Sequence, residues 1–161
     1  MVENDNVYKT GGGGENMSTS ITPVEIPFLG YRAHHQYIRE ELKDRGVHVP
    51  TFTCPADSFA YLNQKTPGVM VVGTDFESHR GFDADKRWDM EDSGGQVSLE
   101  VIRRVRQMPK YTNITPIVVI NSWGKDMERR LKEVGATEVM NLRDVMPSDF
   151  VSVVMRHLKR V

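Results

Sequence analysis

The sequence has little of several features that would point to particular classes of protein. Cys54 is the only cysteine, so no disulfide can form within the chain, and a reducing compartment such as the cytoplasm is expected. No apolar run approaches the roughly 20 residues that a membrane-spanning helix needs, and the N-terminus lacks the pattern of a secretory signal. The formal net charge is only −1, which gives no electrostatic reason to expect nucleic acid or membrane as a partner.

The chain of 161 residues is long enough for one domain with a substantial core and a tail. Its first segment is rich in Asn, Ser, Thr and Gly, with a run of glycine from Gly11 to Gly14. Such a segment buries too little apolar surface to offset the entropy lost on ordering. We therefore expect a disordered leader over residues 1–20 and one domain over residues 21–161.

From residue 21 onward, short apolar segments alternate with segments whose apolar residues recur at helical spacing. The former predict strands at residues 24–29, 47–53, 69–72, 117–120 and 138–142. The latter predict helices at residues 32–45, 57–64, 96–108 and 126–134, and a last helix capped by Ser148. Continuous apolar strands alternating with amphipathic helices are typical of a parallel sheet covered on both faces. Right-handed crossovers then favour a doubly wound α/β fold with the flavodoxin-like strand order 2-1-3-4-5.

Several segments resemble the receiver domains of bacterial response regulators. They are LEVIRRVRQ (residues 99–107), TPIVVINS (115–122), ERRLKEVGATEVMN (128–141) and, at the third strand, PGVMVV (67–72). The resemblance follows the order of elements over residues 22–161 and is specific over residues 99–141. It implies the five-stranded receiver fold and a site for phosphoryl transfer.

A receiver accepts a phosphoryl group on an Asp at the end of its third strand. An acidic pair after the first strand helps to hold Mg²⁺, a Ser or Thr ends the fourth strand, and a Lys ends the fifth. This set of groups suits the chemistry, because carboxylates bind a hard dication and the cations neutralise charge on the transferring group.

In this sequence, uncharged residues stand at all the positions to which the resemblance assigns charged catalytic groups. The acidic pair falls on Gly30 and Tyr31, and the phosphoacceptor falls on Gly73. The hydroxyl falls on Asn121 with Ser122 next to it, the Lys on Leu142 with Arg143 one position further on, and the aromatic switch residue of the fifth strand on Val139. We therefore interpret the domain as a pseudo-receiver, with a degenerate pocket in place of a catalytic site. It is expected not to be an enzyme and to need no metal or other cofactor.

Asp75 keeps a second hypothesis open, that of a phosphorylatable single-domain response regulator in a phosphorelay. Asp75 lies two positions beyond Gly73, so strand alternation would keep both on one side of the sheet. In that case Mg²⁺ would be required. The alternative role for Asp75 is that of a turn residue at the strand exit.

A third hypothesis is a flavodoxin-like module that binds a small molecule, such as a cobalamin or a flavin. Gly30 and Gly73 would open room for a ligand at the topological switch point. Against it, no glycine-rich phosphate fingerprint opens a helix, and Asp75 and His79 do not have the spacing or the position of a cobalamin motif.

A loop of about two dozen residues (73–95) separates the third strand from the third helix, and loops of this length are often functional. It is rich in groups that could bind a metal: His79, Asp83, Asp85, Asp89, Glu91 and Asp92. Their spacing matches no Ca²⁺-binding loop, so no metal site is expected. Phe82 and Trp88 lie among these charges and are candidate anchors for a protein partner.

Three further expectations concern side chains near the same edge of the sheet. Trp123 and Val139 are candidate binding residues on the side of the fourth and fifth strands. The adjacent His34 and His35 are expected at the surface at the start of the first helix. They point about 100° apart on a helix, so they would not share one metal.

The leading functional hypothesis is a signalling adaptor that acts by protein–protein interaction in a two-component or related pathway, without aspartyl phosphorylation. The expected partner is a histidine kinase, an output protein or a scaffold, with a homodimer as a further arrangement. If the chain ends at Val161, the partner has to supply the output.

Overall fold

The computed structural model describes residues 24–30, 35–78, 80–82, 93–112 and 115–159. The elements, in chain order, are β2 (Phe28–Leu29), α1 (Gln36–Asp44), β3 (Thr51–Phe52), α2 (Pro55–Gln64), β4 (Met70–Gly73), α3 (Ser93–Gln107), the 3₁₀ helix η2 (Pro109–Tyr111), β5 (Ile117–Asn121), α4 (Lys125–Val134), β6 (Glu138–Asn141) and α5 (Pro147–Lys159). The segment predicted as a leader, residues 1–20, lies outside the described residues.

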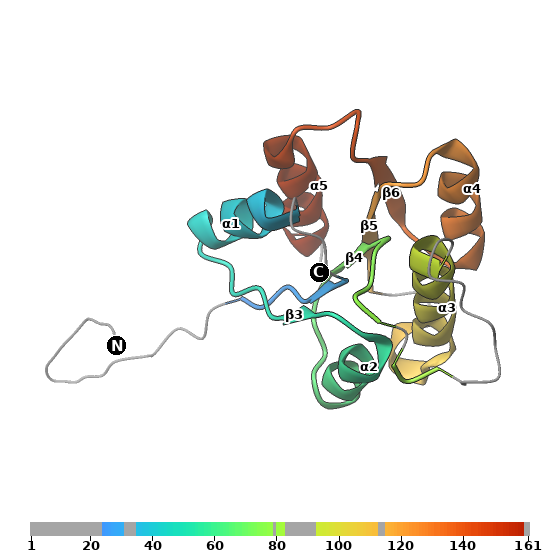
Figure 1. The fold of residues 1–161 in the computed structure, drawn as a ribbon. Coiled ribbons are helices and arrows are strands. Elements are labelled where there is room, and N and C mark those ends of the chain that lie inside the picture. Colours follow the sequence, from blue (N-terminus) through green and yellow to red (C-terminus); the bar gives the residue numbers. More distant parts are fainter. Residues whose placement is uncertain (1–23, 31–34, 79, 83–92, 113–114, 160–161) are drawn as a thin grey trace, which may run out of the picture.

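The five strands form one parallel sheet in the order β3-β2-β4-β5-β6 (Figure 1). In chain order this is 2-1-3-4-5, so the predicted doubly wound topology is confirmed. Strands β2 and β3 are only two residues long, shorter than predicted. Pro27 and Pro50 lack the N–H that a sheet ladder needs, and an isolated bridge between Glu25 and His48 continues the pairing before them.

The start of α5 differs from the prediction that Ser148 caps it. The helix begins at Pro147, and the amides of Asp149 and Phe150 donate to the carbonyl of Met146 at 3.0 and 3.1 Å. Ser148 therefore lies within the first turn. Proline is favoured at the first helical position because its fixed φ suits the helix and its missing N–H would have no helical partner there.

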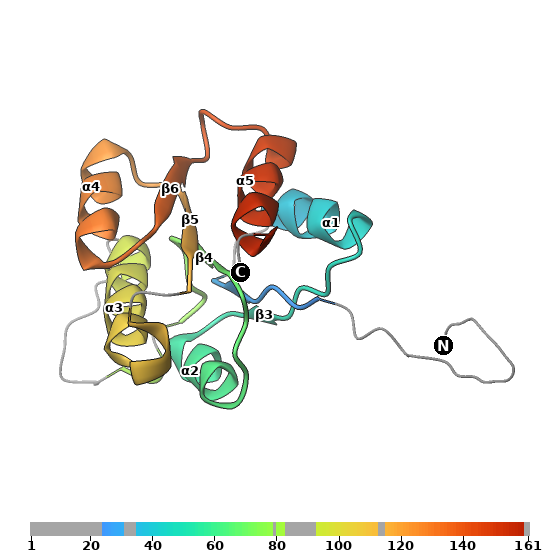
Figure 2. The same cartoon turned by 180° about the vertical axis from the view of Figure 1, so that it is seen from behind.

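The helices cover the two faces of the sheet in separate layers (Figures 1 and 2). Helices α1 and α5 pack together on one face, and α2, α3 and α4 cover the other. Strand β4 serves both layers, because Val71 contributes to the core under α1 and α5 while its neighbours Met70 and Val72 contribute to the other core. No helix within the described ranges is long and apolar enough to cross a lipid bilayer.

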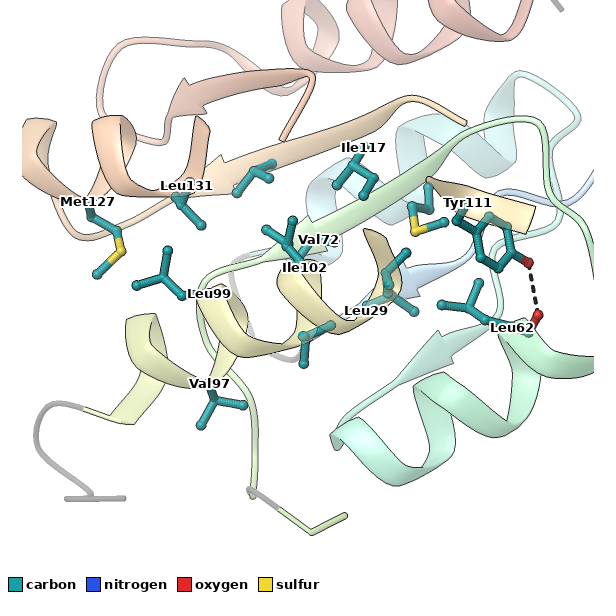
Figure 3. Packing of buried hydrophobic residues seen from close by; sticks show 14 of the residues in the cluster. Leu29, Leu62, Val72, Val97, Leu99, Ile102, Tyr111, Ile117, Met127 and Leu131 are labelled. Atoms are coloured by element: carbon teal, nitrogen blue, oxygen red, sulfur yellow. Dashed lines mark hydrogen bonds between the residues drawn. The ribbon is translucent and has the colours of Figure 1, made fainter. Parts of the chain in front are cut away.

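Tyr111 closes the larger core beneath α3 (Figure 3). Its ring is fully buried, and its hydroxyl donates to the carbonyl oxygens of Leu62 at 2.9 Å and Lys65 at 2.6 Å. Burial raises the pKa of the Tyr111 phenol, which keeps the hydroxyl protonated as a donor. The end of α2 is thereby fixed to the segment that leads into β5.

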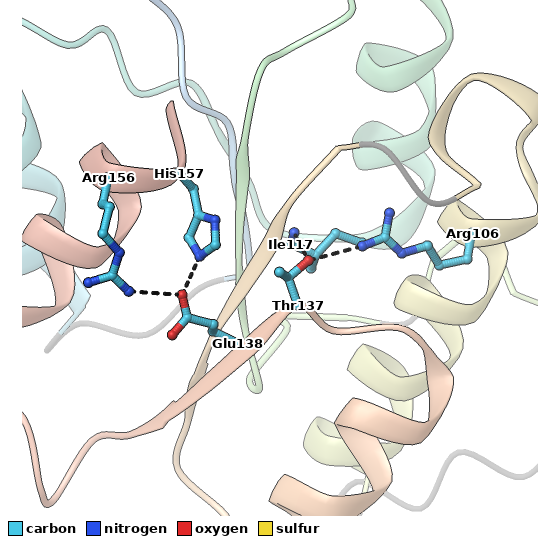
Figure 4. Close-up of polar contacts among 6 residues, drawn as sticks. All are labelled: Arg106, Ile117, Thr137, Glu138, Arg156 and His157. Atoms are coloured by element: carbon cyan, nitrogen blue, oxygen red, sulfur yellow. Dashed lines mark hydrogen bonds and ion pairs between the residues drawn. The ribbon is translucent and has the colours of Figure 1, made fainter. Parts of the chain in front are cut away.

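Arg106, near the end of α3, donates hydrogen bonds to backbone carbonyls around the amino ends of β5 and β6. Its guanidinium donates to the carbonyls of Gly135, Tyr111 and Thr115 at 2.9, 2.8 and 2.8 Å and to Thr137 Oγ1 at 3.2 Å. Figure 4 shows that the same hydroxyl accepts the Ile117 amide, at 2.9 Å. One side chain thus satisfies acceptors from η2, from the segment before β5 and from the segment before β6.

Glu138, the first residue of β6, directs its carboxylate toward α5, in the layer opposite to α3 (Figure 4). Glu138 pairs with Arg156 at 3.3 Å and contacts the ring of His157, both on α5. These contacts fix the end of α5 against the edge strand.

Arg106→Lys tests the role of the guanidinium at this end of the sheet. We expect the free energy of unfolding to fall by about 2 kcal/mol, because an ammonium cannot reach several carbonyls at once and would leave partly buried acceptors without donors. Urea denaturation followed by circular dichroism measures the change. Arg103→Lys is the matched control on the same helix: Arg103 pairs with Glu100 at an exposed site, and a change within about 0.5 kcal/mol is expected. Equal losses in the two variants would contradict the role assigned to Arg106.

Candidate functional site

The carboxyl edge of the sheet is where doubly wound folds place their ligand sites. Gly30 follows β2, Gly73 ends β4, Asn121 ends β5 and Leu142 follows β6. A Cβ added to Gly30 would lie 3.0 Å from the carbonyl oxygens of Gly73 and Asp75. The Leu142 amide donates to the Asn121 carbonyl at 2.9 Å. The four positions assigned from the resemblance therefore share one edge, whereas Tyr31 lies outside the described residues.

The imidazole of His35 lies against Gly73, the position assigned to the phosphoacceptor. A Cβ on Gly73 would stand 2.8 Å from His35 Cε1 and 3.0 Å from Nδ1. The ring also packs against Phe28, with centroids 5.5 Å apart, and His35 has no exposed surface. The expectation of a surface histidine was wrong for His35, because the start of α1 lies over the end of β4. His34 falls outside the described ranges.

Asn121 is held by hydrogen bonds on both sides of its amide group. Its Nδ2 donates to the Gly124 carbonyl at 2.7 Å and to Asn141 Oδ1 at 2.8 Å, and its Oδ1 accepts the Trp123 amide at 3.0 Å. Asn141 Nδ2 donates in turn to Glu128 Oε1 at 2.9 Å. The position assigned to the catalytic hydroxyl thus bears an amide whose polar atoms are already used within the fold.

Thr74 joins the loop after β4 to the loop after β5. Its hydroxyl oxygen accepts the Ser122 amide at 2.9 Å, and its carbonyl oxygen accepts Nε1–H of Trp123 at 3.0 Å. The indole is fixed by this bond although 42% of Trp123 is exposed. Sequence reasoning did not single out Thr74. Its signal was a hydroxyl directly after a buried strand, at the edge where loops meet.

A cavity of about 580 Å³ opens beside this network, between the ends of β5 and β6. Its lining comes from two loops: Asn121, Ser122, Trp123, Gly124 and Lys125, with Asn141, Leu142, Arg143 and Asp144. Leu142, at the position assigned to the catalytic Lys, contributes an apolar side chain. Val139 is half-buried in β6 and packs against the core under α3 and α4.

Asp75 follows β4 at the same edge and is half-buried. Its backbone carbonyl, not its carboxylate, is the group that a Cβ on Gly30 would meet at 3.0 Å. Across the described parts of the chain, no three His, Cys, Asp or Glu residues are grouped so as to hold a metal ion. The described residues at this edge therefore do not fit the Mg²⁺ site of a receiver.

The first part of the long loop is attached to α2. The Glu77 amide donates to the Thr53 carbonyl at 2.9 Å and the Ala56 amide to the Arg80 carbonyl at 2.8 Å, while Arg80 pairs with Asp57 at 3.0 Å. Arg80 holds the pKa of the Asp57 carboxyl below its usual range. These bonds hold the first part of the loop against the start of α2.

Phe82 ends this attached segment inside the core and not at the surface. Its ring is 8% exposed and lies 6.1 Å from the Phe59 ring and 4.5 Å from the Arg104 guanidinium. A buried ring cannot anchor a partner, so the binding role predicted for Phe82 is not retained. Trp88 and the remaining loop residues considered as metal ligands, including His79, fall outside the described ranges.

Of the comparisons with known proteins, the one with solved structures gives matches, and these share one fold. No family model matches the sequence, and no curated protein matches it. Among solved structures, the receiver domain of NtrX from Brucella abortus aligns with a TM-score of 0.64 and 14% identity, covering 84% of this chain and 99% of that one. The chemotaxis response regulator CheY4 of Vibrio cholerae aligns with 0.62 and 17%, again covering 84% and 99%.

A candidate response regulator from Chloroflexus aurantiacus gives a TM-score of 0.64 and 17% identity, covering 86% of this chain and 100% of that one. A longer NtrX chain is covered over only 27% of its length. At these identities the similarity establishes the fold, and that fold is the response-regulator receiver fold.

Asn141→Ala tests the network around Asn121 through the titration of Glu128. The hydrogen bond from Asn141 holds the pKa of Glu128 below its ordinary value, with Lys132 adding to the effect. Without the Asn141 donor, the carboxylate form loses stabilisation, and we expect the pKa to rise toward the ordinary value. Carboxyl ¹³C shifts followed by NMR over a pH series measure it, and the titration of Glu100 on α3 serves as an unchanged reference. An unaltered Glu128 titration would contradict the network.

Phe82→Ala distinguishes a core ring from a surface anchor. We expect the free energy of unfolding to fall by about 3 kcal/mol, because the substitution leaves a cavity between α2 and α3. Urea denaturation gives the value. Tyr37→Ala, at a largely exposed aromatic residue of α1, is the control and should change stability by less than about 1 kcal/mol. A Phe82→Ala protein as stable as that control would return Phe82 to the surface role.

Proposed function

We propose that this chain is a signalling adaptor with a receiver fold, working by protein–protein contact in a two-component or related pathway and without aspartyl phosphorylation. The observation that supports this best is the packing of His35 against Gly73. The position assigned to the phosphoacceptor has no carboxylate, and the space that its side chain would need is filled.

The surroundings of Gly73 support the same proposal. A transferring phosphoryl group requires neutralisation of its charge by cations and preorganised donors. Leu142 provides no ammonium at the position assigned to Lys, and the Asn121 amide donates to Gly124 and Asn141. Gly30 has no side chain with which to bind a dication.

Without a covalent ligand, the fold lacks the usual means of shifting between two states. A ligand changes a conformational equilibrium only as far as its affinities for the two states differ. Val139 also has no ring that could report such a shift. We therefore expect one conformation that is constantly available for contact.

Trp123 marks the surface proposed for that contact. It is partly exposed, is fixed by its bond to the Thr74 carbonyl, and lies at a cavity rim that also includes Lys125 and Arg143. Fixed aromatic side chains contribute much of the binding energy in protein interfaces. The partner is a protein, with a histidine kinase, an output protein, a scaffold or a second copy as the candidates.

Asp75 is the observation that favours the second candidate, a phosphorylatable receiver. It follows β4 at the carboxyl edge of the sheet, and its backbone carbonyl lies close to Gly30. The described residues around it supply neither the further carboxylates for Mg²⁺ nor the ammonium at position 142, so this candidate ranks below the adaptor.

Mass spectrometry of the intact protein after incubation with acetyl phosphate and Mg²⁺ separates the two candidates. We expect no phosphoryl adduct on the wild-type chain or on Asp75→Asn. The described residues around Asp75 do not neutralise the charge of a transferring phosphoryl group. A receiver with its complete acidic site, treated in parallel, shows that the donor is active. An adduct on the wild-type chain that Asp75→Asn abolishes would establish phosphotransfer and overturn the adaptor proposal.

A further inference from the structure

Gly73 stands at a place in the sheet where its own backbone does not require glycine. The glycines with positive φ in the described chain are Gly30, Gly46, Gly81, Gly124 and Gly135, and Gly73 is not among them. It pairs in regular register with Ile120 of β5. Glycine within a strand lowers stability relative to other residues and often marks the close approach of another group. The approaching group here is His35.

We propose that His35 and Gly73 form a coupled pair, in which the imidazole takes the place of the missing phosphoacceptor side chain. This deepens the proposed function and rests on it for the identity of the pocket. The imidazole then occupies the degenerate site, which also lacks the charged catalytic groups of a receiver. A carboxylate cannot be restored at position 73 while His35 stays where it is.

The distances from Gly73 to the side chains around it support this inference. Carbon atoms in contact lie about 3.5–4.0 Å apart, whereas a Cβ on Gly73 would stand 2.8 Å from His35 Cε1 and 3.3 Å from Phe28 Cε1. Any side chain at position 73 therefore overlaps a ring that packs on another ring.

Both partners are held by the packing around them. Gly73 belongs to the central strand β4, bonded to β2 on one side and β5 on the other. His35 is fully buried and immediately precedes α1, whose Ile38 and Leu42 are buried in the core shared with α5. Relief of the overlap would require the imidazole to turn out of its packed position, the start of α1 to move from the sheet, or the imidazole to be removed.

A double-mutant cycle measures the coupling. Gly73→Ala, His35→Ala and the double variant are compared with the wild type by thermal unfolding. We expect Gly73→Ala to lower the midpoint temperature by roughly 3–10 °C in the wild-type background, as overpacking does. In the His35→Ala background, the same change should lower it by less than half as much, or raise it, because the methyl group then enters vacated space.

Gly95→Ala is the matched control in both backgrounds. A Cβ there would meet the flexible end of Met127 at 2.5 Å and lies away from His35, so its effect should be the same with and without His35. Gly73→Asp extends the cycle: it should fold only when His35→Ala accompanies it, as judged by circular dichroism at low temperature.

Equal effects of Gly73→Ala in the two backgrounds would overturn the coupling, and so would a failure to fold in both. Folding of the double variant where Gly73→Ala alone fails to fold would support it. The cycle reports on stability alone. A wild-type phosphoryl adduct on Asp75 would thus remove the proposed function and leave the measured coupling in place, whereas additive stabilities would remove the coupling and leave the absence of phosphorylation intact.

Discussion

Every other feature of this molecule depends on the need to cover a parallel sheet on both faces. The backbone hydrogen bonds of β2, β4 and β5 are protected only if helices exclude water above and below them. Alternate residues of β4 and β5 therefore enter two separate cores, one under α1 and α5 and one under α2, α3 and α4. Because the helices have to lie over the two faces of the sheet, the loops at its two ends are the parts whose structure can vary.

The polar groups at the two ends of the sheet are hydrogen-bonded in different ways. At the amino end, the long side chain of Arg106 reaches carbonyls from three segments, and burial lowers the pKa of its guanidinium. At the carboxyl end, short side chains join adjacent loops: Asn121 to Asn141, and Thr74 to the loop that follows β5. Of these side chains, Asn121 stands at the position that the resemblance assigns to the hydroxyl of a receiver, and its amide is hydrogen-bonded within the fold.

The sequence was sufficient for the topology because the physical signals were local and repeated. Apolar runs at β4 and β5 and helical spacing in α3 and α4 each predict their own element, and the order of elements then selects the sheet. The ends of β2 and β3 were harder to predict. Proline removes ladder bonds there, and how far pairing continues past Pro27 or Pro50 depends on the neighbouring strand.

The position of the candidate site in the fold could be predicted from the sequence, but the contacts between its side chains could not. Gly30, Gly73, Asn121 and Leu142 could be placed at one edge by counting along the strands. The burial of His35 could not be predicted in that way, because it depends on where α1 lies over β4. The glycine in an otherwise apolar strand was an available signal of close approach, although it does not name the approaching residue. Phe82 was misjudged since a loop sequence does not reveal which loop residues turn inward.

The uncharged hydrogen-bonding set at the carboxyl edge also bears on what evolution can do with the fold. Clustered like charges make catalytic sites costly to keep folded, and enzymes accept that loss of stability for the sake of activity. Asn121, Asn141 and Thr74 impose no such repulsion and need no dication to hold them together. An edge built in this way can change the outline of its loops without losing a charged site, while the sheet beneath them stays the same.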